Sequence, residues 1–335
     1  MQGLISVFND NQFFFSTTIS FLVTILSFKL LLPLFVFLRF FDQPTDRSNH
    51  SAPIALGGGV VVIPIIVLIP FLIGYQWSVI HILTLLTLFL VSFVDDLKNV
   101  RAFIRLIIHF LCITIYVHFY LINQLSSFSY INEDYLIVLI YMLSIVGISW
   151  FINAFNFMDG IDGITSVKVI YLTASLILLN HFLDFNNSVL HYSILGVTFG
   201  FLFFNWSPAS IFLGDSGSIP LGFLMMHLLL DLALKGYWVA ALILPMYYIL
   251  DASITLIIRA WKGERFWEAH NQHFYQKFVR SGKNHKQVCF NIIILSLGLF
   301  LFALLSVVLQ NNFVFLIFSV VWCMFFLLKF SNNKK

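Results

Sequence analysis

Charge is what this sequence lacks most. Only 10% of its 335 residues are charged and only 15 are acidic, whereas a soluble domain carries about 25% charged residues. Hydrophobic residues make up 60% of the chain, Phe alone occupies 40 positions, and the mean hydropathy is +0.95. So few charges cannot cover a soluble core of this size. The composition therefore excludes an ordinary cytosolic enzyme and a disordered chain, and it predicts an integral membrane protein.

Cysteine is also scarce. Cys112, Cys289 and Cys323 form an odd, scattered set in or beside apolar stretches, which excludes a disulfide scaffold and a cysteine-based zinc site. The sequence shows no internal repeat at a fixed period, and an inverted-repeat transporter would be expected to show one. No polar segment is long enough to form a separate soluble domain. We therefore expect one integral-membrane domain over residues 1–335.

Long apolar runs predict an all-α polytopic protein with about 11 transmembrane helices, because one bilayer crossing needs about 20 mostly apolar residues. The first run is too long for a signal-peptide core and no small-residue cleavage site follows it, so it counts as a span. The predicted spans are 14–38, 57–75, 79–94, 102–122, 135–155, 164–180, 188–204, 216–234, 237–258, 289–309 and 313–329. Eleven crossings place the two termini on opposite sides.

Basic residues predict the orientation, because Lys and Arg accumulate in cytoplasmic loops. One side receives only Lys235, and Lys29 lies inside the first span. The other side receives Arg39, Arg47, Lys98, Arg101, Arg105, Lys168, Arg259, Lys262, Arg265, Lys277, Arg280, Lys283, Lys286, Lys329, Lys334 and Lys335. The N-terminus is therefore expected outside and the C-terminus in the cytoplasm. The predicted cytoplasmic loops are 39–56, 95–101, 156–163, 205–215 and 259–288.

Two of these loops are rich in oxygen-bearing side chains. Asp95 and Asp96 directly follow an apolar run; they suit a divalent cation or phosphate site, although interfacial solvation also explains acids at a helix end. The motif NAFNFMDGIDGI places four polar residues at steps of three, so that neighbours share a helical face. These residues are Asn153, Asn156, Asp159 and Asp162. Their oxygens suit Mg²⁺ and hydroxyl-bearing ligands such as a nucleoside; a polar turn is the alternative.

Two further loops suit anionic ligands. Asp215 lies in FLGDSGS, where a Gly/Ser-rich helix start offers N–H groups to phosphate oxygens; an ordinary N-cap is the alternative. In loop 39–56, Arg47 and His50 suit an anionic phosphate. The glycine triplet Gly57–Gly59 that follows is more typical of close helix packing in a bilayer.

The last loop carries His270 and His273 in the segment EAHNQHFYQ. Three interpretations stay open: half of a zinc site whose third ligand is not evident, a basic segment that touches lipid phosphates, or imidazoles that face a pyrophosphate. Asp251 lies inside the ninth predicted span, where an ionisable residue is by default a functional hypothesis.

In this order, the motifs resemble those of the polyprenyl-phosphate N-acetylhexosamine-1-phosphate transferases, which form glycosyltransferase family 4. The resemblance covers nearly the whole chain, from the Arg47/His50 segment through VDD, NxxNxxDGxDG and FLGDSGS to the histidine loop. It implies Mg²⁺, or alternatively Mn²⁺, on Asp215 and Asn156. It further implies that Asp95 and Asp96 are catalytic acids near the lipid phosphate, and that the catalytic His270 and His273 lie near the sugar and pyrophosphate. The substrate contacts that it implies are Arg47, His50, Asn153, Asp159 and Asp162.

The resemblance also implies a reaction. The chain would transfer an N-acetylhexosamine 1-phosphate from a UDP-sugar to undecaprenyl phosphate at the cytoplasmic face of a bacterial inner membrane, releasing UMP. Its expected partners are UDP-N-acetylhexosamine, undecaprenyl phosphate and membrane lipid, without nucleic acid; a homodimer stays open. The loop EAHNQHFYQ lacks the consecutive histidines of the muramoyl-pentapeptide branch and resembles the branch that starts O-antigen (lipopolysaccharide) or capsule chains, with a 6-deoxy amino sugar among the candidate donors.

Two other classes compete with the enzyme. One is an ion-coupled transporter of a lipid-linked or phosphorylated sugar, with Asp251 and the paired acids as its relay. The other is a membrane scaffold, which leaves the clustered acids unexplained. Transporters usually place their polar sites near the bilayer midplane, whereas this chain concentrates them at one interface, and this distribution favours the enzyme.

Overall fold

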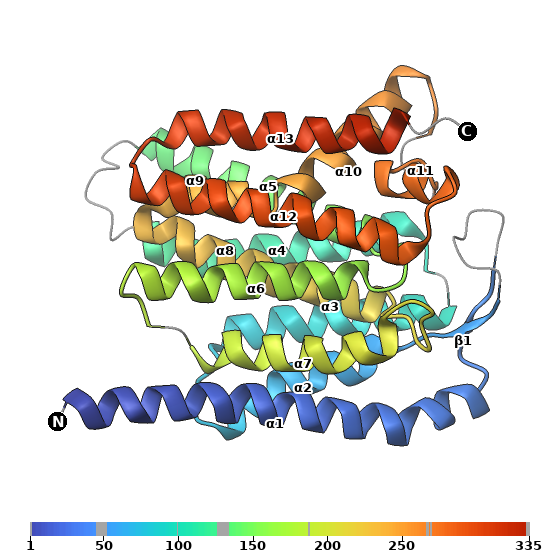
Figure 1. The fold of residues 1–335 in the computed structure, drawn as a ribbon, viewed down its shortest axis with the longest axis horizontal. Coiled ribbons are helices and arrows are strands. Elements are labelled where there is room, and N and C mark those ends of the chain that lie inside the picture. The colour runs from blue at the N-terminus through green and yellow to red at the C-terminus, as the bar shows by residue number, and fades with distance from the viewer. Residues whose placement is uncertain are drawn as a thin grey trace.

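The structure, a computed structural model, describes residues 2–44, 52–98, 100–125, 134–186, 188–265, 268 and 270–332. Long helices run along one common direction and form a bundle (Figure 1). Among the described residues the sheet consists of two short antiparallel strands, β1 (Phe41–Asp42) and β2 (Ile54–Ala55). Large apolar side chains such as Leu30, Phe37 and Phe313 cover the outer surface, as contact with lipid requires. The all-α polytopic membrane fold is confirmed.

Every predicted span coincides with helical structure. Among the described residues, eight helical stretches are long and apolar enough to cross a membrane, and α2 and α7 are shorter apolar helices. The helices are α1 (Gln2–Phe37), α2 (Gly58–Leu72), α3 (Val79–Lys98), α4 (Ala102–Leu125), α5 (Asp134–Phe157), α6 (Ile164–Phe182), α7 (Val189–Asn205), α8 (Asp215–Leu232), η1 (Ala233–Tyr237), α9 (Trp238–Ile243), α10 (Met246–Trp261), α11 (Phe274–Arg280), α12 (His285–Val308) and α13 (Asn312–Asn332). The two termini lie at opposite ends of the bundle (Figure 1).

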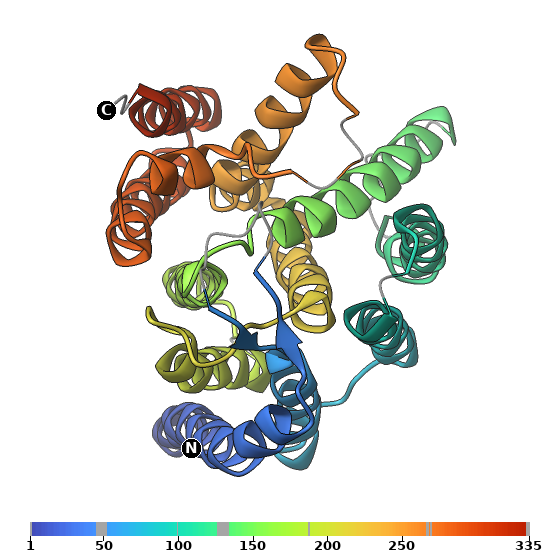
Figure 2. The same cartoon turned by 90° about the vertical axis from the view of Figure 1, so that its right-hand side faces the viewer.

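The ninth predicted span, 237–258, is not one continuous helix. It breaks between α9 and α10 at Pro245, because proline has no N–H to donate and its ring collides with the carbonyl four residues earlier. From this break α10 leaves the bundle at an angle (Figure 2). The break leaves the Leu244 carbonyl available, and Lys168 Nζ of α6 donates to it at 3.1 Å.

The distribution of basic residues suggested that Lys168 is an interfacial charge. The structure shows instead that it is not. Its side chain is fully buried inside the bundle, with Nζ 4.7 Å from the ring centroid of Tyr171 and 5.0 Å from that of Tyr248. A carbonyl and two aromatic faces thus replace water around the ammonium group. The predicted orientation also rests on the other basic residues of the inner side, so leaving Lys168 out of the count does not change it.

The glycine triplet brings two helices into close contact. A Cβ atom at Gly59 would lie 2.2 Å from the backbone nitrogen of Gly217, so only glycine lets α2 and α8 approach this closely. The first amides of α2 are also used internally, since Gly58 N donates to Phe212 O at 2.9 Å and Gly59 N donates to Leu213 O at 2.8 Å. The packing interpretation of this triplet is confirmed, and these contacts fix the loop that leads into α8.

Candidate active site

Hydrogen bonds join the polar loops at the end of the bundle where β1, α11 and the C-terminus lie (Figure 1). Phe212 N donates to Ala55 O at 2.8 Å, which connects loop 205–215 to the β-hairpin. Tyr275 Oη donates to Phe157 O at 3.1 Å, which connects loop 259–288 to the end of α5. Segments that are far apart in the sequence therefore form one polar surface, as the sequence predicts.

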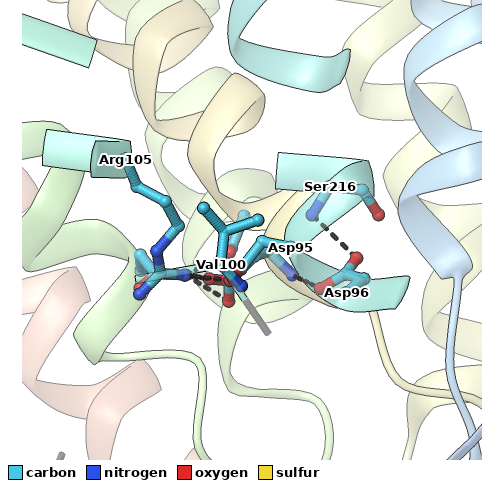
Figure 3. Close-up of polar contacts among 8 residues, drawn as sticks. Asp95, Asp96, Val100, Arg105 and Ser216 are labelled. Carbon is cyan, nitrogen blue, oxygen red and sulfur yellow. Dashed lines mark hydrogen bonds and ion pairs between the residues drawn. The ribbon is translucent and has the colours of Figure 1, made fainter. Parts of the chain in front are cut away.

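Asp96 caps the N-terminus of α8. Its carboxylate accepts hydrogen bonds from the backbone nitrogens of Asp215 at 2.9 Å and Ser216 at 3.0 Å (Figure 3). Gly214 precedes the helix with a φ of 77°, and a Cβ there would lie 2.6 Å from Asp96 Oδ2. Of the two interpretations of FLGDSGS, these contacts favour a capped helix start, with the cap supplied by a carboxylate from α3.

The adjacent Asp95 makes different contacts. It accepts a hydrogen bond from Val100 N at 2.7 Å and forms an ion pair with Arg105 of α4 (Figure 3). The same Nη1 atom of Arg105 lies 2.6 Å from Asp215 Oδ2. One guanidinium thus bridges two carboxylates from different helices and offsets their mutual repulsion. The two neighbouring acids therefore have separate roles.

Asn156 completes the surroundings of Asp215. Its Nδ2 atom donates to Asp215 Oδ1 at 2.9 Å and to Ser218 Oγ at 2.8 Å. Asn153 lies one turn earlier on α5, where its Nδ2 atom donates to Ser149 O at 2.7 Å. The Asp215 side chain keeps 30% of its surface exposed, so a ligand can still reach it.

A cavity of about 310 Å³ lies between α4, α5, α8 and the last loop. It brings together five of the residues that the sequence singles out: Asn153, Asn156, Asp215, His270 and His273. It adds Arg105, His109 and Glu268, to which sequence reasoning gave no role in the site. Both ring nitrogens of His109 are buried without a hydrogen-bond partner among the described residues. Both are therefore available to hydrogen-bond a ligand in the cavity. The available signal was the pair Arg105 and His109, one turn apart near the start of an apolar helix.

Asp159 and Asp162 do not line this cavity. Burial raises the pKa of Asp159 to about 7, and the negative charges of Asp215 and Asp96 act in the same direction. Asp162 Oδ2 accepts from Ala209 N at 3.2 Å and lies 3.2 Å from His285 Nδ1. Although burial raises the pKa of Asp162, these partners outweigh it and hold the pKa below its usual range. Asp162 thus fastens three loops together.

The two histidines of the last loop differ in their surroundings. His273 Nδ1 lies 3.2 Å from Asp251 Oδ1. Burial lowers the pKa of His270 to about 4, and the nearby His273, Arg259 and Lys277 lower it further. His270 is therefore a neutral acceptor or donor near pH 7. Arg47 and His50 lie outside the described residues.

The donor set of the cavity fits Mg²⁺ better than zinc. Among the described residues, no group of three or more His, Cys, Asp or Glu side chains is arranged to hold a metal ion, so the two histidines gain no third zinc ligand there. Asp215 and Asn156 instead offer carboxylate and amide oxygens at the cavity wall. Mg²⁺ is commonly held by one or two carboxylates together with water and substrate phosphates.

Comparison with known proteins gives consistent results. The family model described as glycosyl transferase family 4 matches residues 78–233. A phospho-N-acetylmuramoyl-pentapeptide-transferase of Kosmotoga olearia is 27% identical over 278 residues, which cover 76% of this chain and 84% of the relative. A probable undecaprenyl-phosphate N-acetylglucosaminyl 1-phosphate transferase of Bacillus subtilis is 22% identical over 330 residues, covering 91% and 88%. A phospho-N-acetylmuramoyl-pentapeptide-transferase of Prochlorococcus marinus (strain MIT 9301) is 32% identical over 203 residues, covering 54% and 56%.

Proposed function

Since this chain belongs to glycosyl transferase family 4 and is a membrane phosphosugar transferase, we propose that it uses a UDP-N-acetylhexosamine as donor and undecaprenyl phosphate as acceptor. The observation that carries this proposal is the cavity in which Asp215, Arg105 and three imidazoles meet at one end of the bundle. Acidic, cationic and neutral polar groups at this density suit a diphosphate and a metal ion together. The resemblance of the motifs to the hexosamine-1-phosphate transferases supports the donor.

The reaction exchanges one phosphoanhydride bond for another. An oxygen of the lipid phosphate attacks the β-phosphorus of the donor, the bond to the α-phosphate breaks, and UMP leaves with that bond's electron pair. A phosphomonoester has its second pKa near about 6, so the attacking phosphate is already largely dianionic at neutral pH. A strong general base is therefore not required. Positioning and charge stabilisation are the main tasks of the protein.

Each side chain has a role in this scheme. Asp215 and Asn156 would hold Mg²⁺, which neutralises the diphosphate and the departing UMP. Arg105, held by its ion pair with Asp95, would orient the lipid phosphate at the cavity wall, while Asp96 fixes the start of α8. Asn153, His270 and His273 would contact the donor.

The remaining sequence-derived roles belong to the proposal as well. Arg47, His50, Asp159 and Asp162 would contact substrates directly or through the loops that they hold. Asp162 acts on the loops in this scheme, because its carboxylate is already engaged with Ala209 and His285.

The choice of pathway follows from the last loop. The segment EAHNQHFYQ lacks consecutive histidines, so we propose that the product starts a surface polysaccharide such as an O-antigen or capsule chain. Because some relatives are named as muramoyl-pentapeptide transferases, UDP-N-acetylmuramoyl-pentapeptide is the donor that must be tested for comparison.

The decisive experiment is a UMP-release assay with purified protein, Mg²⁺, undecaprenyl phosphate and, in parallel, UDP-N-acetylhexosamines and UDP-N-acetylmuramoyl-pentapeptide. We expect UMP release that requires both the lipid phosphate and the metal, with a hexosamine as donor. UMP release with the pentapeptide donor alone would instead assign the chain to the muramoyl-pentapeptide branch of the family. Silence with every donor and lipid would contradict the transferase, and uptake of a labelled sugar phosphate into proteoliposomes would then support the transporter.

A second test concerns the side of the membrane. We propose that the cavity faces the cytoplasm of a bacterial inner membrane, because the basic residues gather at that end. Single cysteines replace Lys283, in the turn before α12, and Asn186, in the turn before α7, in a chain whose native cysteines are changed to serine. In intact cells an impermeant thiol reagent should label Asn186→Cys and leave Lys283→Cys unlabelled until the cells are permeabilised. The reverse pattern would invert the proposed orientation.

A further inference from the structure

We propose that Asp251 is a positioning residue that fixes the imidazole of His273 so that its Nε2 atom faces the phosphate groups of the substrate. The inference rests on the proposed function and names a residue that acts through another within the same site. It follows from the contacts of a carboxylate that is 0% exposed and that belongs to α10, the helix that leaves the bundle after Pro245.

Both oxygens of Asp251 are occupied by donors. Oδ1 accepts from Phe274 N at 3.0 Å and from Thr255 Oγ1 at 3.4 Å, and it lies 3.2 Å from His273 Nδ1. Oδ2 accepts from Tyr275 N and from Tyr247 Oη, each at 3.2 Å. A buried carboxylate is tolerated only when it is paired in this way. The set of donors is complete, and one of them is an imidazole that lines the cavity.

The backbone of His273 is fixed independently. His273 is the residue before α11, and its backbone nitrogen donates to Gln276 Oε1 at 3.1 Å in a capping box. Asp251 accepts from the first two amides of the same helix, which have no partner within a helix. Asp251 and the capping box with Gln276 together therefore hold both the side chain and the main chain of His273.

Two aromatic rings fix the plane of the imidazole. The ring of Phe157 from α5 lies 6.1 Å from that of His273 with an interplanar angle of 27°, and the ring of Tyr275 lies at 6.0 Å and 18°. The His273 side chain keeps only 3% of its surface exposed. The imidazole therefore cannot rotate freely.

This arrangement assigns the two ring nitrogens. Nδ1–H donates to the Asp251 carboxylate, which selects the tautomer or the cation with that proton in place. Nε2 has no partner among the described residues and belongs to a ring that lines the cavity. In the imidazolium, whose two nitrogens both carry a proton, the N–H at Nε2 donates to a phosphate oxygen, and the buried negative charge behind the ring strengthens this hydrogen bond as charge develops on the departing phosphate. Preorganisation of this kind acts on the rate more than on binding.

The test is Asp251→Asn, which keeps the size and one acceptor oxygen but removes the charge. We expect kcat for UMP release to fall about 10- to 100-fold, the range found when the group behind a functional histidine is removed, whereas KM for the UDP-sugar stays within about threefold. Asp251→Glu keeps the charge and should retain more activity than Asp251→Asn. Tyr247→Phe is the matched control, since it removes one hydrogen bond to the same carboxylate and leaves its charge; kcat should stay within about twofold.

A double-mutant cycle separates positioning from simple helix capping. If Asp251 acts through His273, adding Asp251→Asn to His273→Gln should cost little further activity. Multiplying losses, or an Asn variant more active than the Glu variant, would overturn the positioning role. A wild-type protein that releases no UMP would overturn the proposed function and this inference together. Full kcat in Asp251→Asn beside an active wild type would overturn this inference alone.

Discussion

Asp215→Asn is expected to remove nearly all UMP release from a protein that remains folded. The charge of Asp215 balances Arg105 and provides the carboxylate proposed for Mg²⁺, and an amide of equal size supplies neither. Charge stabilisation by a metal is worth several kcal/mol, and each 1.36 kcal/mol corresponds to a factor of ten in rate. We therefore expect a loss of at least about 100-fold in kcat, measured over a series of Mg²⁺ concentrations.

The matched control for this substitution is Asp231→Asn. Asp231 lies near the other end of the same helix, where its carboxylate pairs with Lys235 at 2.7 Å on the surface. An exposed pair of this kind contributes about 0–1 kcal/mol to stability, so activity and unfolding temperature should change little. If Asp215→Asn kept near wild-type activity at limiting Mg²⁺, its assignment as a metal ligand would be wrong.

We expect Asp96→Asn to lower both stability and activity, and this combination distinguishes it from Asp95→Asn. The Asp96 carboxylate holds two backbone amides at the start of α8, and the loss of such a cap costs about 0.5–2 kcal/mol. An Asn side chain would place an NH₂ group against one of these amides. The start of α8 would move, and Asp215 would move with it, so we expect kcat to fall more than about tenfold.

Asp95→Asn provides the comparison. It weakens the ion pair with Arg105 but leaves the α8 cap intact, so activity should fall while the unfolding temperature in detergent stays closer to that of the wild type. Thermal unfolding and UMP release measured on both variants distinguish the two roles. Equal effects of the two substitutions on unfolding would contradict the separation of the adjacent acids.

Much of the fold could be predicted because a bilayer constrains helices by length and composition alone. Each predicted apolar run coincides with helical structure, although the ninth is divided between α9 and α10, and the polar loops between the runs meet at one end as expected. The break at Pro245 was not predicted, since the run 237–258 is apolar throughout its first part and a proline kink and a proline break look alike in sequence. The helix α11 has only 7 residues, which is too short for its apolar positions to establish a helical period in the sequence.

The site was predicted in its residue types and less well in its contacts. Asp95 and Asp96 are identical and adjacent, so nothing in the sequence shows that one caps α8 and the other pairs with Arg105. Arg105 was counted only as a basic residue, because its contact with Asp215 joins positions 110 residues apart. Asp251 was recognised as a costly buried acid, but its partner His273 became evident only when α10 and α11 were seen together.

The ammonium group of Lys168 has a consequence for the order in which this protein is assembled in the membrane. A lysine at the centre of an inserted helix costs about 2.5–3.5 kcal/mol, and less near the helix end, where Lys168 lies in α6. The carbonyl that accepts its hydrogen bond belongs to the break between α9 and α10, which is synthesised 76 residues later. Until that segment has been inserted, the charge of Lys168 in α6 lacks this hydrogen-bond partner, and the helix is less stable in the lipid. We therefore expect the sixth span to reach its final depth only when the ninth span has entered the membrane.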